Sequence, residues 1–203
     1  MKSWKADNLL RRVRESGNIV AKDKEHLIQL IKQRIREFGD SCDLNDIDVS
    51  EVTDMSYLFA KAYVKVDISQ WDVSNVENMS GMFYQSGFIG DISQWDVSNV
   101  VKMNSMFQGS EFNGDISKWN VSNVWDMTSM FRESEFNGDI SNWDVSKVEY
   151  MNGMFRGSEF NGDISNWDVS RVRSYTDMFT ASPLEGHEPK WWHKTDMPDS
   201  RNN

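Results

Sequence analysis

The chain repeats itself at a fixed interval of 24 residues. Trp marks one column of the repeat, at Trp71, Trp95, Trp119, Trp143 and Trp167. Phe marks another, at Phe59, Phe83, Phe107, Phe131, Phe155 and Phe179, each preceded by Met or Leu. No copy carries an insertion. A constant repeat length predicts copies that stack, because each copy buries its apolar residues against its neighbours.

The unit reads F-N-G-D-I-S-x-W-D-V-S-x-V-x-x-M-x-x-M-F-x-x-S-x, most regularly from Phe136 to Glu159. Its D-I-S-x-W segment follows an Asn-Gly pair, which predicts a short strand entered by a tight turn. After Trp the apolar residues step by three, as in Val97, Val100 and Met103, which predicts a short helical or 3₁₀ segment. One parallel strand and one short helical segment per copy predict an α/β repeat protein, a leucine-rich-repeat-like solenoid.

The same unit resembles the repeat of the BspA-like leucine-rich-repeat proteins, over residues from about 42 to 180. The resemblance implies a right-handed solenoid used for protein recognition, and it implies no enzymatic activity. Many members of that family are bacterial surface proteins, so a surface location is implied by the resemblance alone.

Three regions are expected. Residues 1–41 form a basic, helical N-terminal cap, residues 42–182 form about six copies of the repeat, and residues 183–203 form a C-terminal cap and tail. Caps are needed because the apolar core of a stack is otherwise open at both ends.

An amphipathic helix is expected from Asp23 to Phe38, with apolar residues at Leu27, Ile31 and Ile35. Asp23 is suited to begin this helix and Gly39 to end it. Lys24, Arg34 and Arg36 lie between the apolar positions, and the segment from Trp4 to Val20 is expected to pack on the helix as a further strand or helix.

At the other end, Trp191 follows Trp167 by one repeat length. A broken seventh copy is therefore expected to close the stack through Trp191 and Trp192. The polar segment from Met197 to Asn203 is expected to be disordered.

The net charge of the chain favours some classes of binding partner over others. The chain holds 22 Lys and Arg against 32 Asp and Glu, a net charge of −10, and the excess of acid lies beyond residue 40. Direct nucleic-acid binding is not expected, because Lys and Arg supply most of that affinity. A protein partner is favoured, and the acidic charge suits a basic one.

The sequence also predicts the cellular compartment of the protein. No apolar run approaches the length of a membrane span, so no membrane partner is expected, and the first twenty residues do not resemble a signal peptide. Cys42 is the single cysteine, which excludes an intramolecular disulfide. A cytoplasmic, reducing compartment is expected.

Catalytic and metal sites find little support. A zinc site from His187, His193 and Asp196 lacks a fourth ligand, and His26 lies in the expected cap helix. The repeated Ser residues are better interpreted as turn formers. We expect no cofactor and no enzymatic activity.

Two columns of Asp residues place like charges close together in successive copies. They are Asp67, Asp91, Asp115, Asp139 and Asp163, and Asp72, Asp96, Asp144 and Asp168, the second interrupted by Asn120. Stacked carboxylates about 5 Å apart repel one another. Either each accepts backbone N–H groups or calcium lies between them, and Asn120 favours the first, because an amide is the poorer calcium ligand.

Columns that change between copies indicate the surface. One reads Glu77, Val101, Trp125, Glu149 and Arg173, and its neighbour contains Tyr150. The repeat does not require Trp125, so an exposed patch of Trp125, Val101 and Tyr150 is a candidate partner-binding site. Arg132, Arg156 and Arg173 are candidate polar contacts. The alternative is that Trp125 merely covers a neighbouring copy.

The sequence thus favours a non-enzymatic solenoid that acts through protein–protein interaction. One alternative is an acidic inhibitor that blocks a basic, nucleic-acid-binding groove of an intracellular enzyme. Another is a bacterial surface adhesin.

Overall fold

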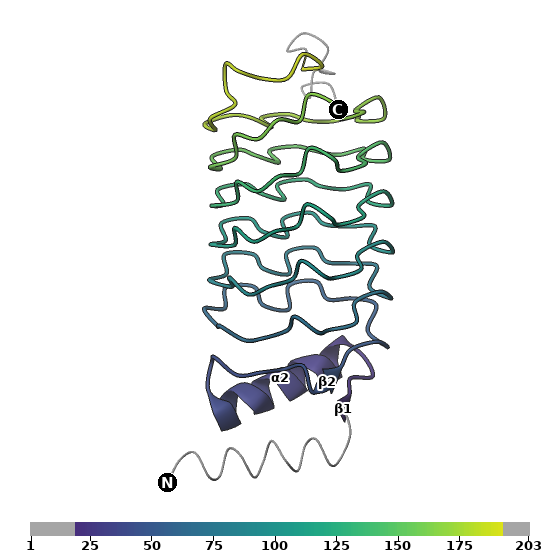
Figure 1. Cartoon of the computed structure of the whole chain (residues 1–203), viewed down its shortest axis with the longest axis vertical. Helices are drawn as coiled ribbons and strands as arrows, with labels where there is room; N and C mark the ends of the chain where they lie inside the picture. Colours follow the sequence, from purple (N-terminus) through teal and green to yellow (C-terminus); the bar gives the residue numbers. More distant parts are fainter. Residues whose placement is uncertain (1–18, 193–203) are drawn as a thin grey trace, which may run out of the picture.

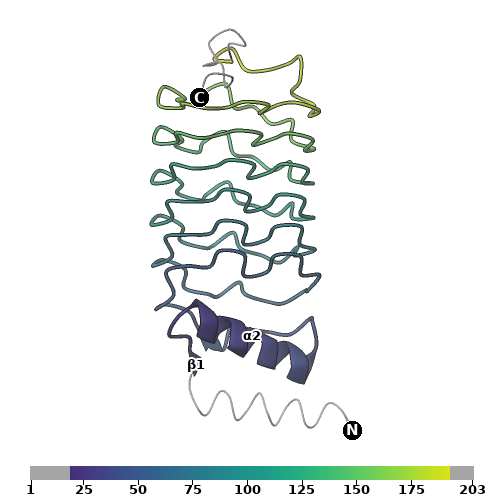
Figure 2. The same cartoon turned by 180° about the vertical axis from the view of Figure 1, so that it is seen from behind.

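The computed structural model describes residues 19–192, which form one helix, one pair of short strands and a stack of repeats (Figure 1). Strand β1 (Ile19–Val20) pairs in parallel with β2 (Ile47–Asp48), and helix α2 spans Lys24–Phe38. The later copies lie one upon another, and α2 crosses the N-terminal end of the stack (Figure 2).

Some expectations cannot be compared with the structure. Of the segment from Trp4 to Val20, only β1 lies within the described residues, and the segment from Met197 to Asn203 lies outside them. Across residues 19–192, no helix has the length and apolar character needed to cross a bilayer.

Helix α2 begins and ends at the expected residues. The Asp23 carboxylate accepts the His26 N–H at 2.8 Å, which satisfies one of the free donors of the first turn. Gly39 follows the last turn with a φ of 91°, and its N–H donates to the Ile35 carbonyl at 2.8 Å. A positive φ favours glycine at this position.

The placement of Arg34 among the polar residues of this helix was wrong. Arg34 follows Leu27 by seven residues and Ile31 by three, so all three share one face, and all three are buried. The buried guanidinium binds the Asp46 carboxylate of the first copy, with Nη2 at 2.5 Å and Nε at 3.1 Å from Oδ2. This ion pair joins the N-terminal cap to the repeats.

The expected strand in the D-I-S-x-W segment was also wrong. In that segment the Asp side chain accepts the N–H of the following Ser, and the Trp95 N–H donates to the Ile92 carbonyl at 3.2 Å, so the chain turns. Within residues 19–192 this segment forms a parallel bridge at Asp67, which pairs with Asp43, and the other isolated bridges lie just before the first Met of each copy. They join Asp54, Asn78, Lys102, Asp126, Tyr150 and Ser174.

The repeats in the described part of the chain contain no helix after Trp either. The spacing of three arises from separate turns, as where the Val100 N–H donates to the Val97 carbonyl at 2.9 Å. A single turn of this kind spaces apolar residues three apart, as a 3₁₀ helix does, but the chain does not continue into a helix.

Backbone hydrogen bonds join each copy to the next over the M-x-x-M-F segment. In one copy the N–H groups of Met103, Ser105, Phe107 and Gly109 donate to carbonyls 23 residues later, at 2.8–3.0 Å. The segments that begin at Met55, Met79, Met127 and Met151 make the same four bonds. All of them run from an N–H to a carbonyl in the following copy, so this ladder has a direction.

The second and fourth residues of this ladder have positive φ in every copy. They are Tyr57, Gly81, Ser105, Ser129, Gly153 and Asp177, and Lys61, Gln85, Gly109, Glu133, Gly157 and Ala181. Most are not glycine, although side chains disfavour this conformation. In the copies that donate to a following copy, the inter-copy hydrogen bonds hold the backbone there.

The core consists of the apolar columns. The Phe rings of successive copies stack with centroids 5.6–6.1 Å apart. Each Trp of the Trp column also donates its indole N–H to the carbonyl of an Ile or Leu 27 residues earlier, as in Trp119 to Ile92 at 3.1 Å. The chain is therefore a repeat protein whose copies are joined through both backbone and side chains.

Candidate functional site

Trp125 lies on the surface of the stack, where the repeat does not require an aromatic residue. Its backbone is fixed, because its N–H donates to the Val101 carbonyl at 3.1 Å and its carbonyl accepts the Glu149 N–H at 2.8 Å. Its side chain is half-buried, which lies between the exposed patch and the covering role that the sequence left open. Neighbouring side chains explain this partial cover.

The Trp125 ring is held between two side chains from adjacent copies. Tyr150 meets it edge to face, with centroids 5.8 Å apart and planes at 74°. On the side of the preceding copy, the Lys102 ammonium lies 5.5 Å from the ring centroid in a cation–π contact. We call Val101, Lys102, Trp125 and Tyr150 the Trp125 surface.

The three candidate arginines do not join this cluster as one group. Arg173 pairs with Glu149 at 3.1 Å, next to Trp125 in the stack. Arg132 and Arg156 line a separate shallow depression that also includes Asp177, with which Arg156 pairs at 3.2 Å. The structure thus divides the predicted site into the Trp125 surface with Arg173 and a second, polar area.

Sequence reasoning missed Lys102 as a member of the site. It lies 23 residues before Trp125, and the ladder brings residues at that separation together. A search for cations one copy before each surface aromatic could have found it.

It also missed exposed apolar residues in the first copies. Tyr57, Tyr63 and Ile89 are 55, 72 and 59% exposed. The Tyr57 ring lies over Gly81, where an added Cβ would come within 2.3 Å of it. A comparison of adjacent copies in the sequence could have found this pair, because Tyr57 and Gly81 occupy the same position of successive copies.

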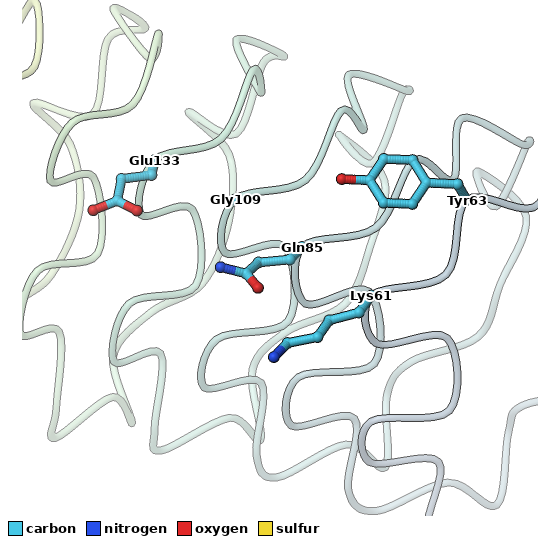
Figure 3. A pocket seen from close by; sticks show the side chains of 5 residues that line it. All are labelled: Lys61, Tyr63, Gln85, Gly109 and Glu133. Carbon is cyan, nitrogen blue, oxygen red and sulfur yellow. The ribbon is translucent and has the colours of Figure 1, made fainter.

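Tyr63 borders a shallow depression that spans several copies and is also lined by Lys61, Gln85, Gly109 and Glu133 (Figure 3). The five residues come from four successive copies, and the polar ends of the four side chains are spread along the depression rather than converging on one point. This arrangement lacks the converging polar groups that fix a small ligand.

The Asp columns act as turn caps, as the Asn120 substitution predicted. In the first column Asp115 and Asp139 accept the N–H of the Ser two residues later at 2.9 Å, and in the second column Asp144 does so at 3.0 Å. Asn120 makes the same bond at 3.2 Å. Among residues 19–192 no group of three His, Cys, Asp or Glu side chains is placed to hold a metal ion.

These bonds favour the charged carboxylates. The backbone N–H of Ser117 lowers the pKa of Asp115, and the hydroxyl of Ser146 lowers the pKa of Asp144. Repulsion within the columns acts against this, since the charge of Asp115 raises the pKa of Asp139, although hydrogen bonds to Ser141 keep it below its ordinary value. Asp115, Asp139 and Asp144 therefore stay charged at neutral pH.

The remaining titratable candidates have structural surroundings. The Nδ1 atom of His26 accepts the Lys22 N–H at 3.3 Å near the start of α2. Cys42 is buried, and burial raises the pKa of its thiol, which lowers its reactivity. Of the weighed zinc ligands, His193 and Asp196 lie outside the described residues.

Comparison with known proteins places this stack in a family. Two overlapping segments, residues 29–110 and 85–192, match the model of the family described as "Mycoplasma protein of unknown function, DUF285". No curated protein and no solved structure matches the chain. The two matches together span most of the chain, so it belongs to the DUF285 family.

Proposed function

We propose that the chain is a non-enzymatic solenoid of the leucine-rich-repeat kind that binds a protein partner through the Trp125 surface. The parallel bridges between successive copies support the solenoid part of this proposal. The Ser and Asp columns are engaged in backbone turns, which supports a structural role for the residues that could otherwise serve as nucleophiles or bases.

The placement of the Trp125 ring is the observation that carries the binding role. The ring contacts Tyr150 and Lys102 on the surface and adds nothing to the Trp column of the core. A half-buried Trp whose backbone and ring are both held loses little conformational entropy on binding. Trp and Tyr are also the residues most enriched among interface hot spots.

The residue types at the Trp125 surface suggest which side chains would form the centre of the interface and which would form its rim. Trp125 and Tyr150 would supply an apolar centre, while Lys102 and Arg173 would supply rim contacts to the partner. Arg132 and Arg156 would add polar contacts only for a partner broad enough to reach the second area.

Affinity capture from the native lysate tests the proposal. We expect Trp125→Ala with Tyr150→Ala to abolish capture of the partner that the wild type retains, with an unchanged circular dichroism spectrum. Glu77→Ala is the matched control, because Glu77 occupies the Trp125 column two copies earlier. Undiminished capture by the double variant would disprove the site.

Salt separates this proposal from the acidic-inhibitor alternative. An apolar contact centred on Trp125 should survive a high-salt wash, because screening weakens charge attraction and leaves apolar burial intact. Release of the partner by salt from both wild type and Glu77→Ala would favour a charge-driven inhibitor.

A further inference from the structure

The shallow depression beside Tyr63 carries opposite charges at its two ends (Figure 3). Lys61, Gln85, Gly109 and Glu133 occupy one column of the repeat, in four successive copies, and Tyr63 borders that column. The four side chains are all exposed. We call these five residues the Lys61–Glu133 groove. None of them belongs to the Trp125 surface, so the groove is a separate candidate for binding.

The backbone beneath the groove is held in place by the ladder. The N–H groups of Lys61, Gln85, Gly109 and Glu133 each donate to a carbonyl of the following copy, at 2.7–2.8 Å. Hydrogen-bonded neighbours of this kind lie about 4.8 Å apart, so the backbones of Lys61 and Glu133 lie about 14 Å apart along the stack. The two charged residues therefore have a fixed separation, with Gln85 and Gly109 between them.

The three polar side chains of the column lean toward the following copy. The Lys61 ammonium lies 5.9 Å from the centroid of the Tyr84 ring, one copy later. A Cβ added to Gly109 would lie 3.2 Å from Cγ of Gln85, and the Glu133 side chain lies over the next glycine of the column in the same way, at 3.3 Å. This lean places the midpoint between the two charges near Gly109, beside the Gln85 amide.

The groove is complementary to a second copy of itself. When that copy is turned end for end about a two-fold axis near Gly109, each Lys61 ammonium faces the Glu133 carboxylate of the other copy. The Gln85 amide, which both donates and accepts, faces its own counterpart at the axis. Gly109 has no side chain to keep the two surfaces apart. A two-fold interface requires this pattern, because every contact in it occurs twice.

We propose that two copies of this chain associate through the Lys61–Glu133 groove as an antiparallel, two-fold dimer. Each dimer contains two pairs of Lys61 with Glu133 and one pair of Gln85 amides. Tyr63, which is 72% exposed in the single chain, lies at the edge of the contact and is covered by the second copy. Tyr is among the residue types enriched in protein interfaces.

The charges of the groove favour a second copy over other occupants. A uniformly basic or acidic partner would meet a like charge at one end, and a small ligand would lack converging polar groups. Glu133 also pairs with Nε of Arg132 through Oε1, at 3.3 Å. A carboxylate accepts several hydrogen bonds, so this pair orients Glu133 and still allows contact with Lys61 of the second copy.

Sedimentation equilibrium of the purified full chain tests the proposal. We expect a monomer–dimer equilibrium for the wild type. Lys61→Glu and Glu133→Lys should each weaken dimerisation at least tenfold, because each places like charges opposite one another at both ends of the contact. Glu77→Lys is the matched control, since it changes the net charge as Glu133→Lys does but lies outside the groove. It should dimerise as the wild type does.

A mixture of the two variants tests the antiparallel arrangement. In a mixed dimer of Lys61→Glu with Glu133→Lys, opposite charges meet again at both ends, so the equimolar mixture should dimerise like the wild type. Circular dichroism checks that each variant is folded. A monomeric wild type, undiminished association of either variant, or a mixture that stays monomeric would overturn the proposal.

The dimer does not depend on the function proposed for the Trp125 surface. Trp125→Ala with Tyr150→Ala should dimerise like the wild type, because neither residue lines the groove. Loss of dimerisation in this double variant would overturn the placement of the contact. Sedimentation uses the purified chain alone, so its outcome is independent of whether a partner is captured from a lysate.

Discussion

The indole Nε1 of Trp191 lies 2.9 Å from the carbonyl oxygen of Ile164. Trp167 makes the same contact with Ile140 at 3.1 Å, one repeat earlier. The Trp column therefore continues into the C-terminal cap, as the sequence predicted for Trp191. Each Trp fills the core and also satisfies a carbonyl of the copy before it.

Trp119→Phe should lower the free energy of unfolding by about 1–3 kcal/mol, because it leaves the buried Ile92 carbonyl without its donor. Urea denaturation measures this change. Trp191→Phe is the matched control at the partly buried end of the same column, where water can replace the indole, so its effect should be smaller. Equal losses at the two positions would contradict this account.

Ser105→Gly should raise the free energy of unfolding by about 0.5–1 kcal/mol, because Ser105 has a φ of 57° and glycine adopts that conformation without strain. Thermal and urea denaturation both report the change. Gln108→Gly, three residues later and outside the positive-φ columns, should destabilise by a similar amount. Destabilisation by both substitutions would show that Ser105 is not strained.

The protein should become less stable in acid, because protonation of the Asp columns removes their stabilising effect. The native pKa values of Asp115, Asp139 and Asp144 lie below the ordinary value of about 3.9, so these carboxylates stabilise the fold above that pH and lose this effect as the pH falls through the native pKa. Asp144→Asn should be less stable than wild type at pH 7, and the difference should shrink in acid. A difference that stays constant from pH 7 to pH 2 would contradict the assignment.

Arg34→Met should lower the free energy of unfolding by about 1.5–3 kcal/mol, because it removes the hydrogen-bonded partner of the partly buried Asp46 carboxylate. Adding Asp46→Leu should recover much of that loss by removing the unpaired charge. Urea denaturation of both variants makes the comparison. A double variant no more stable than Arg34→Met would show that packing, and not the charge pair, is the main contribution of Arg34.

The sequence predicted the parts of the fold that depend on residue type at a fixed spacing. The 24-residue period placed the Trp and Phe columns in the core, and the Asn120 substitution identified the Asp columns as turn caps. Asp23 and Gly39 marked the ends of α2 because capping is a local backbone property.

Contacts between copies could not be predicted in the same way. The cation–π contact of Lys102 with Trp125 depends on a ladder offset of 23 residues, which no single copy reveals. The burial of Arg34 depends on the first copy, which supplies Asp46.

The sequence by itself determined that this protein is an array of equal copies, because only stacking buries a repeated apolar pattern. Tertiary structure decided what the backbone does within each copy. Separate turns and positive φ angles replace the expected strand and helix, because hydrogen bonds between copies favour them over local propensity. It also decided that the ladder has a direction, with each N–H bonded to a carbonyl of the following copy, and this polarity follows from the fold and not from any residue type.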